Sequence, residues 1–386
     1  MTPTRHDGWA VVTPGFERVA AQELRALGIE PRAAEPGGVP FSATPAELLH
    51  ANLSLRSVSR VLVRVAEFRA RAFHELERLS RAVDWSEFVA PGMQVRLRVT
   101  CRKSRLYHSD AVAERVAKAI ERAVPAARAA AAGDEGDDDA PADTDTQLFV
   151  VRLSHDVCTI SADSSGELLH RRGYRLATAK APIRETTAAG LLLALGWDGT
   201  RPLLDPMCGS GTIAIEAALI ARNVAPGLGR RFACERWPTM PAGVPAAARV
   251  AARRAARDRC AVPLLSSDRD AGAIAAAQAN AERAGVTGDI AFRQCALSAV
   301  EPPQGPGLVL VNPPYGDRVG DKGALRNLYA QLGNVARAKC AGWTLAFLSA
   351  DRAFDAQVGL PFRDMLSFRN GGIPVRVVAA EVPSRG

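Results

Sequence analysis

The hydrophobic pattern of the second half of the chain alternates between two periods. Apolar residues recur at helical spacing over residues 183–197, 212–223, 271–285 and 324–340. Short apolar runs typical of buried strands occur over residues 202–205, 261–268, 289–295, 307–314 and 343–350. This alternation predicts a parallel sheet with helices on both faces, and in such sheets ligands bind beyond the carboxyl ends of the strands.

The first half of the chain is predicted to form smaller α/β modules. Strands are expected over residues 9–14, 59–70 and 94–101 and as a pair over 147–163, with helices over 15–28 and 72–83. A further helix should begin near Ser109 or Asp110, either of which could cap it. Residues 126–146 are acidic and of low complexity, so we expect a disordered loop inserted within the second module.

The strand at residues 94–101 and the turn after it are rich in basic residues. Alternation puts Val95, Leu97 and Val99 on one face of this strand and Arg96 and Arg98 on the other. Side chains that can pair with phosphates or stack on a base follow in the turn: Arg102, Lys103, Ser104, Arg105 and Tyr107. A second cluster, HRRGYR at residues 170–175, adds Arg171 and Arg172 as candidate nucleic-acid contacts. A solvated surface loop is the simpler alternative for both clusters.

Composition narrows the class of protein. A chain of 386 residues is long enough for two or three domains. The net charge of +8 favours a polyanionic partner, although an arginine-rich and alanine-rich composition can also reflect nucleotide bias in a genome. Seven scattered cysteines predict neither a metal site nor a disulfide framework. We see no membrane span and no secretory signal, so a cytoplasmic protein is expected.

A glycine-containing turn follows the strand at residues 202–205. In DPMCGSGT, residues 205–212, Gly209 and Gly211 permit a tight turn and a close approach of a ligand to backbone amides. The turn lacks the lysine of a phosphate-binding loop and the third glycine of a dinucleotide fingerprint. Asp268, at the end of the next strand, stands where an acidic group can bind ribose hydroxyls, or it caps the following helix.

The stretch LVNPPYGDR, residues 310–318, suggests the chemistry. The side-chain oxygen of Asn312 and a carbonyl on the rigid Pro313–Pro314 segment can both accept hydrogen bonds from one amino group, while Tyr315 offers a face to a planar ring. This arrangement suits an amine on a flat heterocycle, which can be made to react through orientation and electrostatics without a covalent enzyme intermediate. A base held in this way must leave its stack.

The combination of glycine turn, acidic strand end and NPPY resembles the class I methyltransferases that use S-adenosylmethionine. Most of the chain is similar to bacterial RNA guanine-N2 methyltransferases with a THUMP RNA-binding domain, closest to the 23S rRNA enzymes; the stretches TPGFERVAAQELRALG, CRKSRLYHSDAV, LHRRGYR and DPMCGSGTIAIEAA carry the likeness. The resemblance implies a ferredoxin-like segment at 1–65, a THUMP domain at 66–165 and a Rossmann-like class I methyltransferase domain at 166–386.

The same resemblance assigns roles to residues. Base presentation falls to Asn312, Pro313, Pro314 and Tyr315. Cofactor binding falls to Asp205, Met207, Cys208, Gly209, Gly211, Thr212, Asp268, Arg269 and Asn312. One departure concerns the residue after the third strand, where the family usually has an acidic contact to adenine and this chain has Cys295 and Ala296. Another group must make that contact, or cofactor affinity is reduced.

Several functions remain open at this point. The NPPY stretch also suits adenine-N6 methylation of DNA and glutamine-N5 methylation of proteins. A tRNA enzyme of the same architecture and a non-catalytic RNA-binding assembly factor are further alternatives. Cys208 is a poor candidate for a nucleophile of cytosine methylation, because it lies in the cofactor turn. The chain length predicts a single activity, whereas the target guanosine and the oligomeric state are left open.

Overall fold

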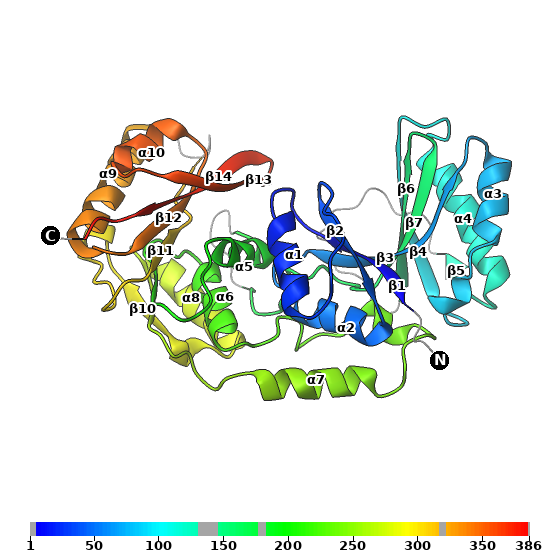
Figure 1. Ribbon diagram of the computed structural model, residues 1–386, viewed down its shortest axis with the longest axis horizontal. Helices are drawn as coiled ribbons and strands as arrows, with labels where there is room; N and C mark the ends of the chain where they lie inside the picture. Colours follow the sequence, from blue (N-terminus) through cyan, green and yellow to red (C-terminus); the bar gives the residue numbers. More distant parts are fainter. Residues whose placement is uncertain (1–4, 130–145, 177–182, 316–321, 385–386) are drawn as a thin grey trace. The chain divides into compact units, whose positions relative to one another are not determined.

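The structure is a computed structural model that describes residues 5–129, 146–176, 183–315 and 322–384. The chain forms two compact units (Figure 1). Unit 1 comprises Met1–Val12, Ala21–Leu169 and Arg230–Ala251, and unit 2 comprises Thr13–Ala20, His170–Gly229 and Ala252–Gly386. We predicted contiguous domains with a boundary between residues 165 and 166. Neither unit is contiguous, because Thr13–Ala20 belongs to unit 2 and Arg230–Ala251 belongs to unit 1.

Unit 1 is built on a single seven-stranded sheet in the order β2-β1-β3-β7-β6-β4-β5. Its strands are β1 His6–Val11, β2 Gly38–Ala43, β3 Arg60–Arg69, β4 Gln94–Arg102, β5 Arg128–Ala129, β6 Thr146–Ser154 and β7 Val157–Asp163. The predicted boundary between residues 65 and 66 falls inside β3, so the two predicted N-terminal modules share one sheet. Strand β2 was not predicted, and the acidic loop lies largely outside the described residues.

The helices of unit 1 are α1 Glu17–Ala26, which begins in unit 2, α2 Pro45–Ser54, α3 Phe73–Arg81 and α4 Ser109–Ala123, with a 3-10 turn at Trp85–Glu87. Helix α2 was not predicted. Helix α4 begins where expected, but its N-cap position is His108, and Ser109 and Asp110 are its first two residues. Val95 and Leu97 of β4 are buried whereas Arg96 and Arg98 are only half-buried, as their alternation predicts.

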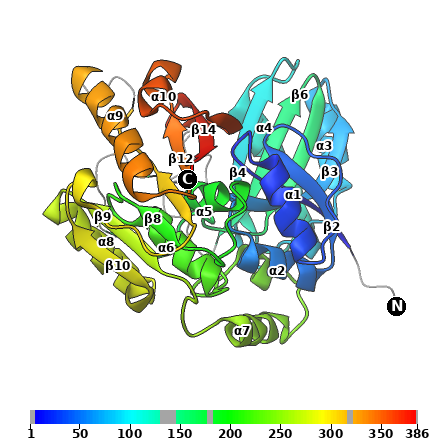
Figure 2. The same ribbon diagram turned by 60° about the vertical axis from the view of Figure 1, so that its left-hand side comes forward.

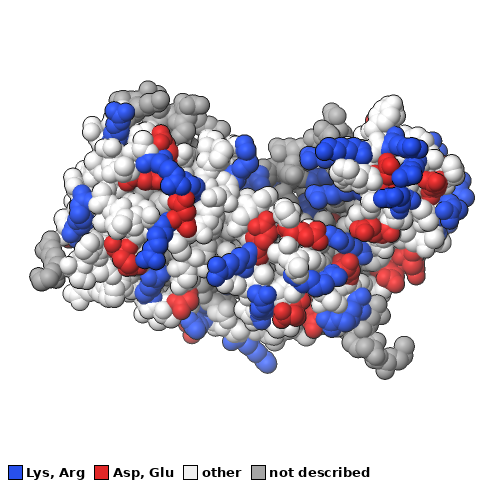
Figure 3. Space-filling model, turned by 45° about the horizontal axis from the view of Figure 1, so that its top comes forward, with Lys and Arg blue, Asp and Glu red and all other residues white. Residues whose placement is uncertain are grey.

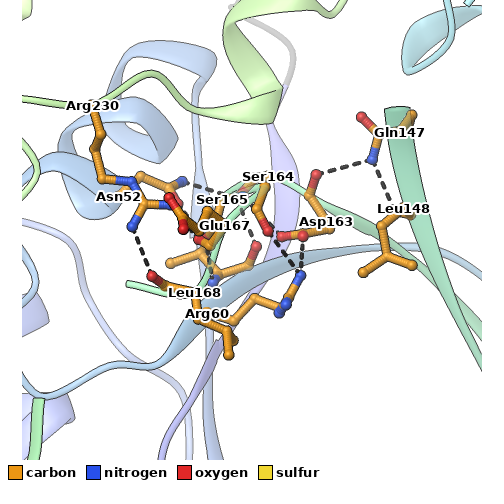
Figure 4. Close-up of polar contacts among 12 residues, drawn as sticks. Asn52, Arg60, Gln147, Leu148, Asp163, Ser164, Ser165, Glu167, Leu168 and Arg230 are labelled. Carbon is orange, nitrogen blue, oxygen red and sulfur yellow. Dashed lines mark hydrogen bonds and ion pairs between the residues drawn. The ribbon is translucent and has the colours of Figure 1, made fainter. Parts of the chain in front are cut away.

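A buried polar network joins the returning segment Arg230–Ala251 to the rest of unit 1 (Figure 4). Arg230 donates hydrogen bonds to the carbonyl oxygens of Leu168, at 2.7 Å, and Glu167. Asp163, fully buried, pairs with Arg60, and the amide of Ser165 donates to it at 2.9 Å. The network therefore connects β3, the end of β7 and a segment about 65 residues later in the chain.

Unit 2 contains the doubly wound sheet that the alternating pattern predicts. Its strand order is β10-β9-β8-β11-β12-β14-β13. The strands are β8 Leu203–Asp205, β9 Leu264–Asp268, β10 Ile290–Gln294, β11 Leu308–Val311, β12 Thr344–Ser349, β13 Arg363–Asn370 and β14 Ile373–Glu381. Strands β8 to β12 pair in parallel, and β14 runs antiparallel to both of its neighbours. The β13–β14 hairpin was not predicted.

Helices cover both faces of this sheet, as Figures 1 and 2 show. They are α5 Glu185–Ala194, α6 Thr212–Ala221, α8 Ala271–Arg283, α9 Lys322–Lys339 and α10 Arg352–Val358, with short 3-10 turns at Thr287–Asp289 and Leu297–Ala299. A further 3-10 turn, Ala233–Arg236, belongs to unit 1. Val309 and Val311 pack in one cluster with Tyr329 and Leu332 of α9. All four residues of β11 are buried, which explains its uninterrupted apolar sequence.

Two further segments complete the description. Helix α7, Val244–Ala255, begins in unit 1 and ends in unit 2. Within unit 2 the segment Thr13–Ala20 packs on β13: the rings of Phe16 and Phe368 lie 5.0 Å apart, and a Cβ atom at Gly15 would lie 2.1 Å from the carbonyl oxygen of Ser367. None of the helices in the described ranges is long and apolar enough to span a bilayer.

Candidate active site at the ends of three parallel strands

Three polar side chains predicted for the site converge at one edge of the unit 2 sheet. Asp205 ends β8, Asp268 ends β9, and Asn312 follows the last residue of β11. These strands are neighbours, and all three run in the same direction. The strand order reverses between β8 and β11, and open α/β sheets bind their ligands at such a switch point.

The glycine turn after β8 leads directly into α6. Gly211 caps this helix with a φ of 80°, and a Cβ atom there would lie 2.9 Å from the Cβ of Ala277 on α8. Only glycine meets both requirements without strain. The turn is tied to β9, because the amide of Cys208 donates to the carbonyl oxygen of Ser267 at 3.0 Å. Backbone amides and the positive end of α6 are therefore held in place beside the strand ends.

Asp268 connects two loops at this edge. One carboxylate oxygen accepts a hydrogen bond from the amide of Gly209 and the other from the amide of Asp270, both at 3.0 Å. The capping role considered for Asp268 belongs to Asp270, whose side chain accepts from Gly272 and Ala273 at the start of α8. Each carboxylate oxygen of Asp268 retains capacity for another donor, such as a ribose hydroxyl.

Asp205 is buried and only partly satisfied. It is 1% exposed, one oxygen accepts a 3.3 Å hydrogen bond from the amide of Met207, and the other has no hydrogen-bond partner among the described residues. Burial is the main cause that raises the pKa of Asp205 to about 8; the hydrogen bond from Met207 opposes this rise and the nearby charge of Asp268 adds to it. An orphaned carboxylate oxygen in such a place fits a cationic ligand group, such as the ammonium or sulfonium of S-adenosylmethionine.

The Asn312–Tyr315 segment also contains a buried oxygen whose hydrogen-bonding capacity is unused among the described residues. The side-chain oxygen of Asn312 is buried without a hydrogen-bond partner in the described part of the chain. Pro313 is buried, Pro314 is exposed and Tyr315 is half-buried. The hydroxyl of Tyr315 accepts a hydrogen bond from Asn370, at the end of β13. An oriented acceptor and a fixed ring thus lie together after β11, and residues 316–318 of the motif fall outside the described ranges.

The remaining predicted cofactor residues have unequal environments. Cys208 is buried with Ile274 and Ala277, and burial raises the pKa of its thiol, which argues against a nucleophilic thiolate. Thr212 is buried in the first turn of α6, Met207 is half-buried, and Arg269 is exposed. The cofactor contacts of Met207, Cys208, Thr212 and Arg269 stay predictions.

No acidic residue occupies the two positions directly after β10, which are Cys295 and Ala296. The amide of Cys295 donates to the carbonyl oxygen of Asp268 at 3.0 Å, so this position lies beside the proposed ribose contact. Cys295 is half-buried against the α9 cluster, and Ala296 precedes the turn Leu297–Ala299. Neither residue has a carboxylate, so a backbone group or another side chain must supply any adenine contact there.

The candidate RNA residues divide into two groups. Arg102, Lys103, Arg105 and Tyr107 are exposed on unit 1, and Ser104 is half-buried. The prediction for Arg172 does not fit the structure: its side chain is 3% exposed and its guanidinium lies 3.5 Å from the buried carboxylate of Glu216 in unit 2. Arg172 therefore belongs to the core, because a buried carboxylate there needs a cation nearby.

Two residues with roles at these sites were missed in the sequence. Asn370 orients Tyr315 from a hairpin about 55 residues later, and no motif marked it. Glu185 is buried in the first turn of α5 and pairs with Arg175 at 3.0 Å; burial raises its pKa to about 7. The only signal for Glu185 was its place in the conspicuous stretch APIRETTAAGLLL.

Comparison with known proteins agrees with this geometry. Residues 172–377 match the family described as "RMKL-like, methyltransferase domain", and residues 9–62 match "RlmL ferredoxin-like domain". A protein of Synechocystis sp. with the provisional name RNA methyltransferase slr0064 is 34% identical over 99% of this chain and 98% of its own length. The ribosomal RNA large subunit methyltransferase K/L of Syntrophotalea carbinolica is 34% identical over 97% of this chain, which spans about half (53%) of that relative.

A solved structure shares the complete fold. It is the crystal structure of SMU.472, a provisionally named methyltransferase complexed with SAH, which superposes with a TM-score of 0.88 at 28% identity and covers 100% of both chains. The family match covers the five parallel strands and β13, ends within β14, and includes Asp205, Asp268 and the Asn312–Tyr315 segment. The chain therefore belongs to the RMKL-like methyltransferase family and carries an RlmL-type ferredoxin-like domain at its N-terminus.

Proposed function

We propose that this methyltransferase transfers the methyl group of S-adenosylmethionine to the N2 amine of a guanosine in 23S rRNA. The observation that carries the proposal is the buried side-chain oxygen of Asn312, one strand away from a buried carboxylate oxygen of Asp205; neither oxygen has a hydrogen-bond partner among the described residues. One oxygen suits a substrate amine and the other a cationic cofactor. The names of the relatives support RNA as the substrate class.

The residues of the chain would divide the work as follows. Asp205, the amides of the glycine turn and Asp268 would hold S-adenosylmethionine, which supplies an electrophilic methyl group when bound. Asn312 would accept a hydrogen bond from the guanosine amine, and Tyr315, fixed by Asn370, would support the ring. Because the lone pair of such an amine is delocalised, the gain comes from orientation and from stabilising the positive charge that develops on nitrogen.

Replacement of Asn312 by alanine tests this role. We expect transfer to fall by at least about 100-fold, the order seen when a preorganised polar group is removed from an active site. The affinity for S-adenosylmethionine, measured by calorimetry, should be retained. Asn334→Ala is the matched control, because Asn334 lies on α9 and accepts only a hydrogen bond from Arg337. Full activity of the Asn312→Ala protein would refute the assignment.

The substrate is tested separately. Purified protein is incubated with labelled S-adenosylmethionine and unmodified 23S rRNA, tRNA or DNA, and the modified nucleoside is identified by mass spectrometry. N2-methylguanosine in 23S rRNA alone supports the proposal, and the same product in tRNA alone transfers it to tRNA. N6-methyladenine in DNA would replace it. Cofactor binding without any transfer would point to a protein target or a ribosomal intermediate, and no cofactor binding would favour an assembly factor.

A further inference from the structure

Three loops of unit 1 meet at one end of its sheet. The register aligns Arg69 of β3 with Val157 of β7, Val157 with Ser154 of β6, and Ser154 with Arg102 of β4. The loops that leave these positions form what we call the basic corner: Arg69, Arg71, Arg102, Lys103, Arg105 and His155, each exposed. Figure 3 shows Lys and Arg side chains gathered in the upper right, where this end of unit 1 faces the viewer.

One acidic residue lies at the centre of the basic corner. The carboxylate of Asp156 accepts a hydrogen bond from the amide of Arg105 at 2.8 Å and pairs with Arg71 at 3.3 Å. Its own amide donates to the hydroxyl of Ser104 at 3.0 Å, and its carbonyl oxygen accepts from the amide of Ala70 at 2.9 Å. Asp156 therefore contacts both of the neighbouring loops through its backbone and its side chain.

The backbone around Asp156 is held in an uncommon conformation. Lys103, His155 and Asp156 have φ values of 46°, 52° and 64°, a region that non-glycine residues seldom occupy. The hydroxyl of Ser104 donates to the carbonyl oxygen of Arg102, and the amide of His155 donates to the same carbonyl. Leu106 is buried and anchors the loop from below, while Tyr107 beside it is 67% exposed. Backbone strain of this kind persists where surrounding contacts fix it, often at binding sites.

We propose that Asp156 is a positioning residue that holds the loop of Arg102, Lys103 and Arg105 in the shape that binds the phosphate backbone of RNA. This rests on the proposed RNA-directed function and adds the β6–β7 turn to the binding surface. Asp156 would not touch the RNA itself. Its contribution is preorganisation, because a loop that is already ordered loses less conformational entropy when it binds.

Electrostatics alone predicts the opposite effect of removing Asp156. A carboxylate among cations repels a polyanion, so neutralising it should strengthen RNA binding at low salt. If Asp156 instead organises the loop, neutralising it should weaken binding. The accepted hydrogen bond from Arg105, followed by the charges of Arg71 and Arg105, holds the pKa of Asp156 below its ordinary value, so the carboxylate is ionised at neutral pH.

Asp156→Gly separates the carboxylate from the backbone, since glycine accepts a positive φ without strain. We expect the affinity of the full-length protein for an unmodified 23S rRNA transcript, measured by filter binding, to fall about fivefold, the order of the net contribution of one typical hydrogen bond. Asp156→Asn, which keeps one acceptor, should show a smaller fall. Glu114→Gln removes an equal charge from α4, where Glu114 forms an exposed ion pair with Lys118, and should cause no fall.

A double-mutant cycle tests whether Asp156 acts through the loop. When Arg102, Lys103 and Arg105 are replaced by glutamine, Asp156→Gly should cause no further fall, because there is no cationic loop left to position. An undiminished fall in that background, or unchanged or tighter binding by Asp156→Gly alone, would overturn the role of Asp156. Failure of the unaltered protein to bind RNA would overturn this inference and the RNA-directed function together, and an unchanged urea denaturation curve would confirm that each variant is folded.

Discussion

Two buried aspartates, one in each unit, have opposite surroundings. Asp163 in unit 1 is fully buried, and its two oxygens are engaged by Arg60 and by the amide of Ser165. Asp205 in unit 2 is buried to nearly the same degree, yet one of its oxygens has no hydrogen-bond partner in the described ranges and the nearest charge that acts on it is another carboxylate, Asp268.

The difference separates a stabilising group from a binding group. A buried carboxylate costs free energy unless donors or a cation compensate it, and around Asp163 the fold supplies both. Around Asp205 the fold supplies one long hydrogen bond, so compensation must come from a ligand. Burial alone would therefore have ranked the two residues equally, and the partners of each oxygen distinguish them. The predictions that follow are ordered from the largest expected effect to the smallest.

Asp163→Ala should lower the free energy of unfolding of unit 1 by about 3 to 5 kcal/mol, because it leaves the nearly buried guanidinium of Arg60 without its partner. Urea denaturation measures this effect. The control is Asp7→Ala, which breaks the pair with Arg32 on the surface of the same unit and should cost less than about 1 kcal/mol. Equal losses in the two variants would remove the distinction drawn for Asp163.

Asp205→Asn should weaken S-adenosylmethionine binding about tenfold or more, the order expected for loss of a charge-assisted contact. At pH 8 and above, where Asp205 is ionised, the free energy of unfolding should stay constant or increase, because a buried, poorly compensated charge and its repulsion with Asp268 are both removed. Calorimetric titration and urea denaturation give the two quantities. A variant that binds the cofactor normally but unfolds more easily would make Asp205 a structural residue like Asp163.

The pH dependence of S-adenosylmethionine binding also tests whether Asp205 contacts the cofactor. With a pKa of about 8, Asp205 is mostly protonated at pH 7 in the free protein, so affinity for the cationic cofactor should rise as pH increases towards 8, by up to about tenfold per pH unit. In Asp205→Asn this rise should disappear. Titrations at pH 6.5, 7.5 and 8.5 test it, and a rise of equal slope in the variant would assign the proton to another group.

The free energy of unfolding of the cofactor-free protein should change in the opposite direction and decrease as pH rises. Folded unit 2 binds more protons than the unfolded chain between the ordinary aspartate pKa near 4 and about 8, so the stabilising contribution of neutral Asp205 is present at low pH and is lost as pH rises through this window. Glu185, with a pKa of about 7, acts in the same direction. Denaturation of the cofactor-free protein at pH 6 and pH 8 should show a smaller difference in Asp205→Asn than in the unaltered protein.

Asn370→Ala should have the smallest effect, a decrease in kcat of about three- to tenfold with unchanged cofactor affinity, because Tyr315 keeps its ring but loses the donor that orients it. Steady-state kinetics on the RNA substrate measures this decrease. In a Tyr315→Phe background the same replacement should change kcat little, since no hydroxyl remains to be held. An equal decrease in both backgrounds would mean that Asn370 acts on something other than Tyr315.

Local sequence signals predicted the parts of the fold that local physics determines. The alternating periods located the five parallel strands of unit 2 and most of its helices, and Gly211 and Asp268 marked two strand ends. The NPPY stretch was informative because a polar side chain on a proline-rigid segment at the end of a buried strand suggests binding more readily than a purely structural role. These features depend on residues close together in the chain, which a pattern of about ten residues can represent.

Long-range pairing could not be predicted in the same way. The β13–β14 hairpin has its turn at Gly371 and Gly372, but no periodic signal showed that it would join the sheet beside β12 or present Asn370 to Tyr315. Arg172 looked like a surface cation because its buried partner, Glu216, lies 44 residues later inside an apolar helix. Asp156 gave no signal, since its partners lie in two other loops.

The way the chain is divided between the two units determines when each unit can be completed during synthesis. Unit 1 needs Arg230–Ala251, so the ribosome must add about 80 residues after Leu169 before that unit can be completed. At ordinary elongation rates this takes roughly ten seconds. Until Arg230 has been added, the carbonyl oxygens of Glu167 and Leu168 lack the hydrogen bonds that it donates. Unit 2, in contrast, receives its Thr13–Ala20 segment first and its last strand at the end. A nascent chain stalled near residue 200 would therefore contain neither unit in finished form, and a cut at residue 169 would separate each unit from a piece of itself.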